Sequence, residues 1–139
     1  MALTLAIFRI NGVWAPISAA SVAAELTQQL RILRPKVIFT VSQLLETTLQ
    51  AARACQFPED KIYICEMPGD RSISVTFPTL SRLRNRGRLL AELEPISQAP
   101  GKWKRQVAYI CSSSGTSGFP VSFAFSFRSI GQQDWNRNK

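Results

Sequence analysis

Histidine is absent from the 139 residues of this chain, and cysteine occurs only three times. Without histidine, the sequence has neither the commonest general base nor the imidazole of a Ser-His-Asp triad or a His-containing metal site. Cys55, Cys65 and Cys111 are widely spaced and odd in number, so neither a disulfide framework nor a zinc pattern is supported. We expect three buried free thiols, and we assign no catalytic residue and no metal ligand.

Long apolar runs are also lacking. No stretch reaches the roughly 18 apolar residues that a membrane-spanning helix needs. The first ten residues are short and carry Arg9 near their end, unlike the charged start and longer apolar core of a signal peptide. We therefore expect an intracellular protein, and the sequence does not separate the cytoplasm from the peroxisome.

Acidic residues are scarce, with nine Asp and Glu against 17 Lys and Arg, which gives a formal charge of +8. Much of the excess is local: it lies in Arg82-Leu83-Arg84-Asn85-Arg86-Gly87-Arg88 and in Lys102, Lys104 and Arg105. A nucleic-acid platform would interleave aromatic residues with these charges, and only Trp103 does so. The basic stretch is therefore interpreted as a solvated helix face, and nucleic-acid binding is not favoured.

The apolar residues that are present alternate between helical and strand-like spacing. Leucines and Val22 recur at helical spacing from Val22 to Leu33, with Ser21 as the expected N-cap and Pro35 as the stop. Residues 3–10 fit either a helix or a strand, and residues 13–17 are more strand-like. Further along, we expect strands at 36–41, 61–65 and 107–111, and helices at 42–55 and 79–90. Tandem strand-helix units predict the α/β class, here a partial doubly wound parallel sheet with covering helices.

The most informative segment follows the last of these strands. Ser112-Ser113-Ser114-Gly115-Thr116-Ser117-Gly118-Phe119-Pro120 comes directly after Val107–Cys111. Hydroxyls and glycines at this density make a loop whose backbone N–H groups can turn toward an anion. The spacing of Gly115 and Gly118, with no lysine after them, excludes the P-loop of nucleotide hydrolases. An ordinary turn is the alternative that composition alone favours.

The stretch VAYICSSSGTSGFP resembles the phosphate-binding signature of the adenylate-forming enzymes, in particular the acyl-CoA synthetase and 4-coumarate-CoA-ligase-like group. The segments GVWAPISAASVAAELTQQLRILRPKVIFT and LLETTLQAARACQFPEDKIYI are similar to upstream parts of the same family, so the resemblance covers about residues 10 to 120. It implies a fragment of the family's large N-terminal domain. It also implies that ATP phosphates, with magnesium sharing their charge, are held by Ser113, Ser114, Gly115, Thr116, Ser117 and Gly118.

The sequence also departs from the family pattern. Ser112 stands where the family has an aromatic residue, and Val121 stands where it has a lysine, so the cradle lacks its fixed cation. Residues 121–139 do not match the family, and we interpret them as a tail from translated intron or a shifted reading frame, after a partial AMP-binding domain at 1–120. Phe123, Phe125 and Phe127 alternate there, which predicts an extended segment that adds to an exposed edge or promotes aggregation.

In the family, a carboxylic acid is activated by ATP to an acyl-adenylate and then transferred to coenzyme A. The acidic magnesium ligand, the ribose-binding acid, the acyl pocket and the catalytic lysine of the family lie downstream of the cradle, so we expect this chain to be an inactive fragment that self-associates. Three alternatives stay open: a weak phosphate or nucleotide binder, a basic interaction protein that uses Arg82–Arg88, and a hydrolase of unknown type. Ser113 or Ser114 as a nucleophile would lack both a nearby base and a Gly-x-Ser-x-Gly elbow.

Overall fold

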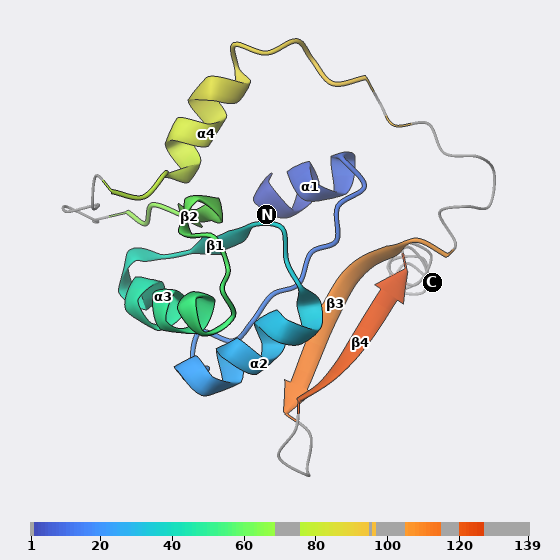
Figure 1. The fold of residues 1–139 in the computed structure, drawn as a ribbon. Helices are drawn as coiled ribbons and strands as arrows, with labels where there is room; N and C mark the ends of the chain where they lie inside the picture. The colour runs from blue at the N-terminus through green and yellow to red at the C-terminus, as the bar shows by residue number, and fades with distance from the viewer. Residues whose placement is uncertain (1, 69–75, 95, 97–104, 115–119, 127–139) are drawn as a thin grey trace. The chain divides into compact units, whose positions relative to one another are not determined.

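The computed structural model describes residues 2–68, 76–94, 96, 105–114 and 120–126 (Figure 1). The chain forms two compact units. One comprises Met1–Ile17 and Leu93–Lys139, and the other comprises Ser18–Glu92. Both helices and strands occur, so the predicted α/β class is confirmed.

The Ser18–Glu92 unit contains a two-stranded parallel sheet with helices around it. The strands β1 (Ile38–Thr40) and β2 (Ile62–Ile64) pair with Ile38 opposite Ile62 and Thr40 opposite Ile64. They are joined through the helix that was predicted at 42–55, which confirms the strand-helix-strand connection. The other elements are α2 (Ala23–Leu33), the 3-10 turn η1 (Ser42–Leu44), α3 (Leu45–Ala54), the 3-10 turn η2 (Glu59–Lys61) and α4 (Leu80–Gly87).

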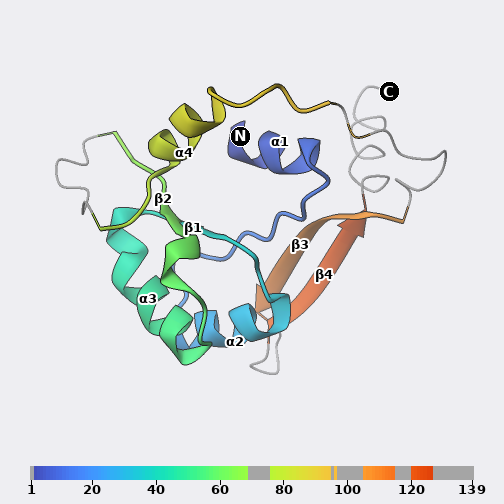
Figure 2. The same cartoon turned by 45° about the horizontal axis from the view of Figure 1, so that its top comes forward.

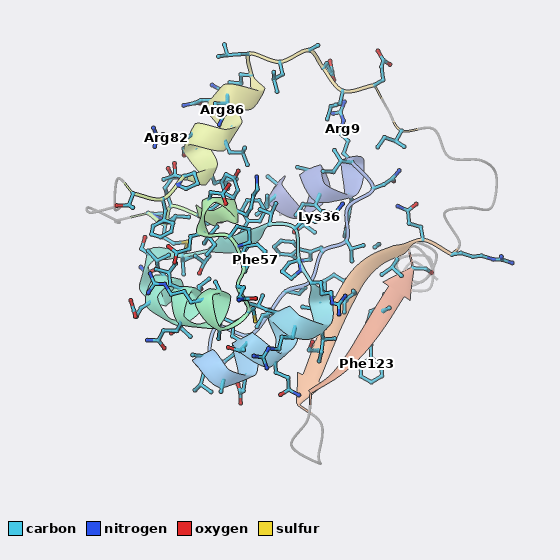
Figure 3. The ribbon with its side chains drawn as sticks, in the orientation of Figure 1. Arg9, Lys36, Phe57, Arg82, Arg86 and Phe123 are labelled. Atoms are coloured by element: carbon cyan, nitrogen blue, oxygen red, sulfur yellow. The ribbon has the colours of Figure 1, made fainter. Side chains whose placement is uncertain are left out.

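The core of this unit lies between α3 and the parallel pair. Ile62 and Ile64 of β2 are fully buried, and Leu49 and Ala52 of α3 are buried too. Figure 2 shows α2 and α3 side by side, and the two helices pack together. The partly buried residues packed against the cluster are Ile38, Leu45, Phe57 and Phe77, of which Phe57 is labelled in Figure 3. The face of α3 that carries Leu45, Leu49 and Ala52 is therefore the face that covers the sheet.

At the two ends of α2, the predicted N-cap is wrong and the predicted stop before Pro35 is confirmed. Val22, and not Ser21, is the N-cap, and it makes no side-chain cap bond, so the expected Ser21 cap is wrong. Ser21 instead belongs to the turn before the helix, where its N–H donates to the carbonyl of Ser18 at 3.1 Å. At the other end, Arg34 adopts a left-handed conformation with φ 44° and donates its N–H to Leu30, directly before Pro35. The proline therefore stops the helix as predicted.

The other unit contains α1 (Ala2–Arg9) and a two-stranded antiparallel sheet. The strand β3 (Val107–Ser114) contains the predicted strand 107–111, and it pairs with β4 (Pro120–Ser126) from Val107 opposite Ser126 to Ser114 opposite Pro120. The stretch 3–10, which fitted either element from sequence, is helical up to Arg9. Within the strand-like stretch 13–17, Trp14 forms a single parallel bridge to Tyr109.

The strand β4 begins at Pro120, the last residue of the predicted domain, and continues into the predicted tail at 121–139. Phe123 and Phe125 lie in this strand, so they add to the edge of β3, which is one of the two outcomes expected for them. Phe127 lies outside the described residues. The origin of residues 121–139 stays a prediction.

Within the described residues, no helix has the length and apolar character needed to cross a membrane.

Candidate functional site

The predicted phosphate cradle lies at the closed end of the β3–β4 hairpin. Ser113 and Ser114 are the last residues of β3, and their backbones pair with Val121 and Pro120 of β4. The other four predicted site residues, Gly115, Thr116, Ser117 and Gly118, lie outside the described residues. The structure therefore fixes the two strands from which the cradle segment starts and to which it returns.

The strand β3 is held along both edges near its middle. On one edge, the Trp14 N–H donates to the Ala108 carbonyl and the Ile110 N–H donates to the Trp14 carbonyl, each at 2.9 Å. On the other edge, β4 supplies the antiparallel partner. Ala108 between these contacts is fully buried. The first half of β3 is therefore bonded on both edges, whereas Ser113 and Ser114, where the cradle segment leaves, pair with β4.

Aromatic contacts add to the hairpin. The rings of Tyr109 and Phe125, which face each other across the two strands, lie 6.1 Å apart between centroids at an angle of 55°. Burial raises the pKa of the Tyr109 phenol, and the neighbouring Cys111 thiol adds to this effect. Tyr109 is therefore a neutral packing residue at physiological pH, and the hairpin presents no ionised phenol to the cradle.

The sequence around the hairpin favours an anion. No Asp or Glu occurs between Glu94 and Asp134, whereas Lys102, Lys104, Arg105 and Arg128 all fall in that interval. A phosphate at the cradle would therefore meet no carboxylate from β3, β4 or the chain between them.

A second polar cluster lies at the carboxyl ends of β1 and β2 in the other unit. Thr40 and Thr48 are both buried, and their hydroxyl oxygens lie 3.0 Å apart within hydrogen-bond distance. Thr48 also donates to the Leu44 carbonyl at 2.8 Å, and the Cys65 N–H donates to the Thr40 carbonyl at 2.7 Å. The two buried hydroxyl groups therefore have hydrogen-bond partners within the unit, and these bonds link β1 to α3 and to the residue after β2.

Glu66 follows β2 and fixes the start of α4. Its carboxylate accepts the Ser81 N–H at 3.0 Å, and the Thr79 hydroxyl accepts the Arg82 N–H at 3.2 Å. The chain before α4 is also tied to β2, because the Ile64 N–H donates to the Pro78 carbonyl at 2.9 Å. The sequence predicted a helix beginning at Thr79, but it carried no signal for Glu66, which lies 15 positions before Ser81.

The Glu66 contact makes the first turn of α4 sensitive to pH. Desolvation acts to raise the pKa of Glu66, but hydrogen bonds from Thr79 and Ser81 outweigh it, so the pKa lies below its ordinary value of 4.5. A lowered folded-state pKa means that the stabilisation is complete above about pH 4.5 and is lost as the pH falls through the folded value. We expect Glu66→Gln to remove this acid-dependent loss, measured as the pH dependence of urea unfolding. Glu46→Gln, on the exposed side of α3, is the control, and an unchanged pH profile in Glu66→Gln would contradict the assignment.

The titratable side chains do not assemble into a metal site in the part of the chain that the structure describes. No group of three Cys, Asp or Glu side chains there is suitably placed. The three cysteines are free, as predicted, but each is only partly buried, so the expected full burial is wrong. Burial and the neighbouring Glu66 raise the pKa of the Cys65 thiol, which therefore stays protonated.

Comparison with solved structures first defines the class of fold. The red-emitting luciferase of Phrixothrix hirtus matches with a TM-score of 0.70 at 19% identity, over 94% of this chain and 30% of that chain. The anthranilate CoA ligase AuaEII, solved in complex with anthranoyl-AMP, matches with a TM-score of 0.69 at 15% identity, over 88% of this chain and 22% of that chain. The fold is thus that of part of the large domain of adenylate-forming enzymes.

Comparison with curated sequences points to one group within this class of enzymes, the acyl-CoA ligases. The acyl-CoA ligase cm3C of Cordyceps militaris is 37% identical over 122 residues, which cover 84% of this chain and 19% of that protein. Other curated relatives of similar coverage, at 30% identity or more, are also acyl-CoA ligases. No family model matches the chain. The predicted resemblance is confirmed: over 84% of its length this chain is similar to acyl-CoA ligases, and its fold matches that of adenylate-forming enzymes. It spans about a fifth of the length of the curated relatives it matches.

Proposed function

We propose that this chain is the phosphate-binding portion of an acyl-CoA ligase. In the complete reaction, a carboxylate oxygen attacks the α-phosphorus of ATP and pyrophosphate leaves, which gives an acyl-adenylate. The thiol of coenzyme A then attacks the acyl carbon, AMP leaves, and a thioester forms. The observation that carries the proposal is the cradle motif at the closed end of a hairpin, in a chain whose curated relatives are acyl-CoA ligases.

The cradle's own contribution would be to hold the β- and γ-phosphates of ATP. Backbone N–H groups from Ser113 to Gly118 would donate to phosphate oxygens, and the hydroxyls of Ser113, Ser114, Thr116 and Ser117 would add donors. Gly115 and Gly118 would let the backbone approach closely because they have no Cβ. The residues fit an anionic group, since the segment from Val107 to Ser126 contains hydroxyl and backbone N–H donors and no carboxylate.

Magnesium would enter this site bound to the ATP phosphates. Its preferred protein ligands are carboxylate and carbonyl oxygens, and the hairpin strands contain no Asp or Glu. The chain's own share of the charge stabilisation would therefore come from N–H and hydroxyl donors. ATP and coenzyme A are supplied inside cells, so an acyl-CoA ligase function agrees with the intracellular location expected from the sequence.

ATP binding by this chain tests the proposal. At an ATP concentration ten times Kd, binding to the folded state alone stabilises by about 1.4 kcal/mol, which raises the melting temperature measurably. Replacing two hydroxyl donors in Ser114→Ala/Thr116→Ala is expected to weaken ATP affinity about tenfold, at roughly 0.5–1.5 kcal/mol for each hydrogen bond.

Ser126→Ala is the matched control, because Ser126 pairs with Val107 at the opposite end of the hairpin from the cradle. It should bind ATP like the unchanged chain, and adenosine without phosphates should produce no shift in any variant. Equal ATP shifts in the cradle and control variants would show that the nucleotide binds elsewhere. No shift with any nucleotide would overturn the proposed phosphate contact.

A further inference from the structure

The α4 helix and the turn after it carry four arginines on an exposed segment, Arg82–Leu90. Arg82, Arg84, Arg86 and Arg88 are all exposed, and the segment contains no acidic residue. Figure 3 shows Arg82 and Arg86, which are one helical turn apart, on the same side of α4. Within the described residues, none of the four guanidinium groups forms an ion pair. The segment therefore presents a concentrated positive charge to its surroundings.

Exposed leucines accompany these arginines. Leu89 is 87% exposed and Leu90 is 74% exposed, while Leu83 within α4 is 37% exposed. The N–H groups of Leu89 and Leu90 donate to the carbonyls of Arg86 and Gly87, so the chain continues turning after α4 ends. Leu83 lies in α4, whereas Leu89 and Leu90 lie in the turn after it, so apolar side chains are interspersed with the arginines along the segment.

This combination discriminates between possible roles of the segment. A merely solvated face explains the arginines, but it does not explain two leucines that leave most of their surface in water. A single-stranded nucleic-acid surface would need aromatic side chains for base stacking, and none occurs from Thr79 to Leu90. An anionic bilayer matches both features, because arginines attract its headgroups while the leucines enter the boundary between headgroups and acyl chains.

We propose that Arg82–Leu90 is a peripheral binding site for anionic phospholipid membranes. The segment lies on the bilayer surface, with its leucines inserted shallowly and its guanidinium groups on lipid phosphates and carboxylates. Binding is reversible, because one short segment with a few apolar side chains gives far less affinity than a spanning helix. In the sequence, Glu92 and Glu94 follow the segment and end the run of positive charge. The site is separate from the phosphate cradle, so its existence does not depend on the proposed ligase function.

Sedimentation of the full 139-residue chain with vesicles tests the site. We expect the chain to bind vesicles of phosphatidylcholine mixed with phosphatidylserine, to release at high salt, and not to bind phosphatidylcholine alone. Arg82→Gln/Arg86→Gln should lower the partition coefficient about 25-fold, since each arginine near the surface contributes roughly a factor of five. Leu89→Ser/Leu90→Ser should lower it by a similar factor without removing the salt dependence.

The matched control is Arg34→Asn/Lys36→Gln, which removes two positive charges from exposed positions of the same unit, and asparagine suits the left-handed conformation at 34. This variant should keep nearly all vesicle binding, and circular dichroism should show the same helix content in all variants. Equal losses in the arginine and control variants would mean nonspecific attraction by net charge and would overturn the site. Absence of vesicle binding by the unchanged chain, or salt-sensitive binding to an oligonucleotide with no vesicle binding, would also overturn it.

Discussion

Mixed with ATP, magnesium, coenzyme A and a panel of fatty and aromatic acids, the 139-residue chain is expected to form no acyl-CoA. Most of the rate in such a reaction comes from orienting the reactants and stabilising charge at the reacting atoms. This chain supplies the cradle motif but spans about a fifth of the length of its acyl-CoA ligase relatives. The expected effect is a loss of all turnover above background, even where ATP still binds.

The measurement is the formation of acyl-CoA and of AMP, compared with a heat-treated sample. The acyl-CoA ligase cm3C of Cordyceps militaris, assayed with the same panel, serves as the full-length comparison. AMP release that depends on the native chain would contradict the expectation and would mean that the first half-reaction needs only the part of the protein present here.

The elements with regular periodicity were predictable from the sequence. Leucines and Val22 at helical spacing gave α2, because burial on one face imposes that spacing. The alternation of strand-like and helical segments gave β1, α3 and β2. The parallel pairing of β1 with β2 followed as well, since a helix between two strands favours a crossover connection. These features depend on residues close together in the chain.

The structural features that the sequence did not predict depend on contacts between residues far apart in the chain, or on which of two adjacent residues caps a helix. The alternating phenylalanines predicted an extended segment, but its antiparallel pairing with β3 depends on which edge is open after folding. Ser21 has the side chain of a good cap, yet the preceding turn uses its N–H and the helix begins after Val22. The Glu66 bond to Ser81 links the end of a strand to the start of a helix, and no local pattern marks such a contact.

The cradle hypothesis came from the order of its residues, whereas the contacts that support the strand before it could not be predicted. Serines and glycines directly after an apolar strand gave the anion-binding hypothesis. The contacts of Trp14 with Ala108 and Ile110, which hold β3 in place, join positions more than ninety residues apart. The sequence therefore suggested the candidate site, and the structure shows which contacts hold the strand that leads into it.

The second large effect is expected from two phenylalanines on the same face of β4. Phe125 is 37% exposed and its ring contacts Tyr109, whereas Phe123 is 51% exposed and lies opposite Cys111. Phe125→Thr should therefore lower the free energy of unfolding of the hairpin's unit by about 1–2 kcal/mol, from lost burial and a lost aromatic pair. Phe123→Thr should cost less than about 0.5 kcal/mol and should reduce self-association, because it removes an exposed apolar ring from an edge strand.

The pair is matched, since both changes replace phenylalanine by the same β-branched residue in the same strand and on the same face. Urea unfolding gives the stability difference, and sedimentation velocity gives the change in self-association. A tail without an evolved partner would give two small and equal stability losses, because neither ring would then pack better than the other. A larger loss in Phe125→Thr, accompanied by weaker ATP binding, would instead show that β4 supports the cradle, since it forms the strand to which the cradle segment returns.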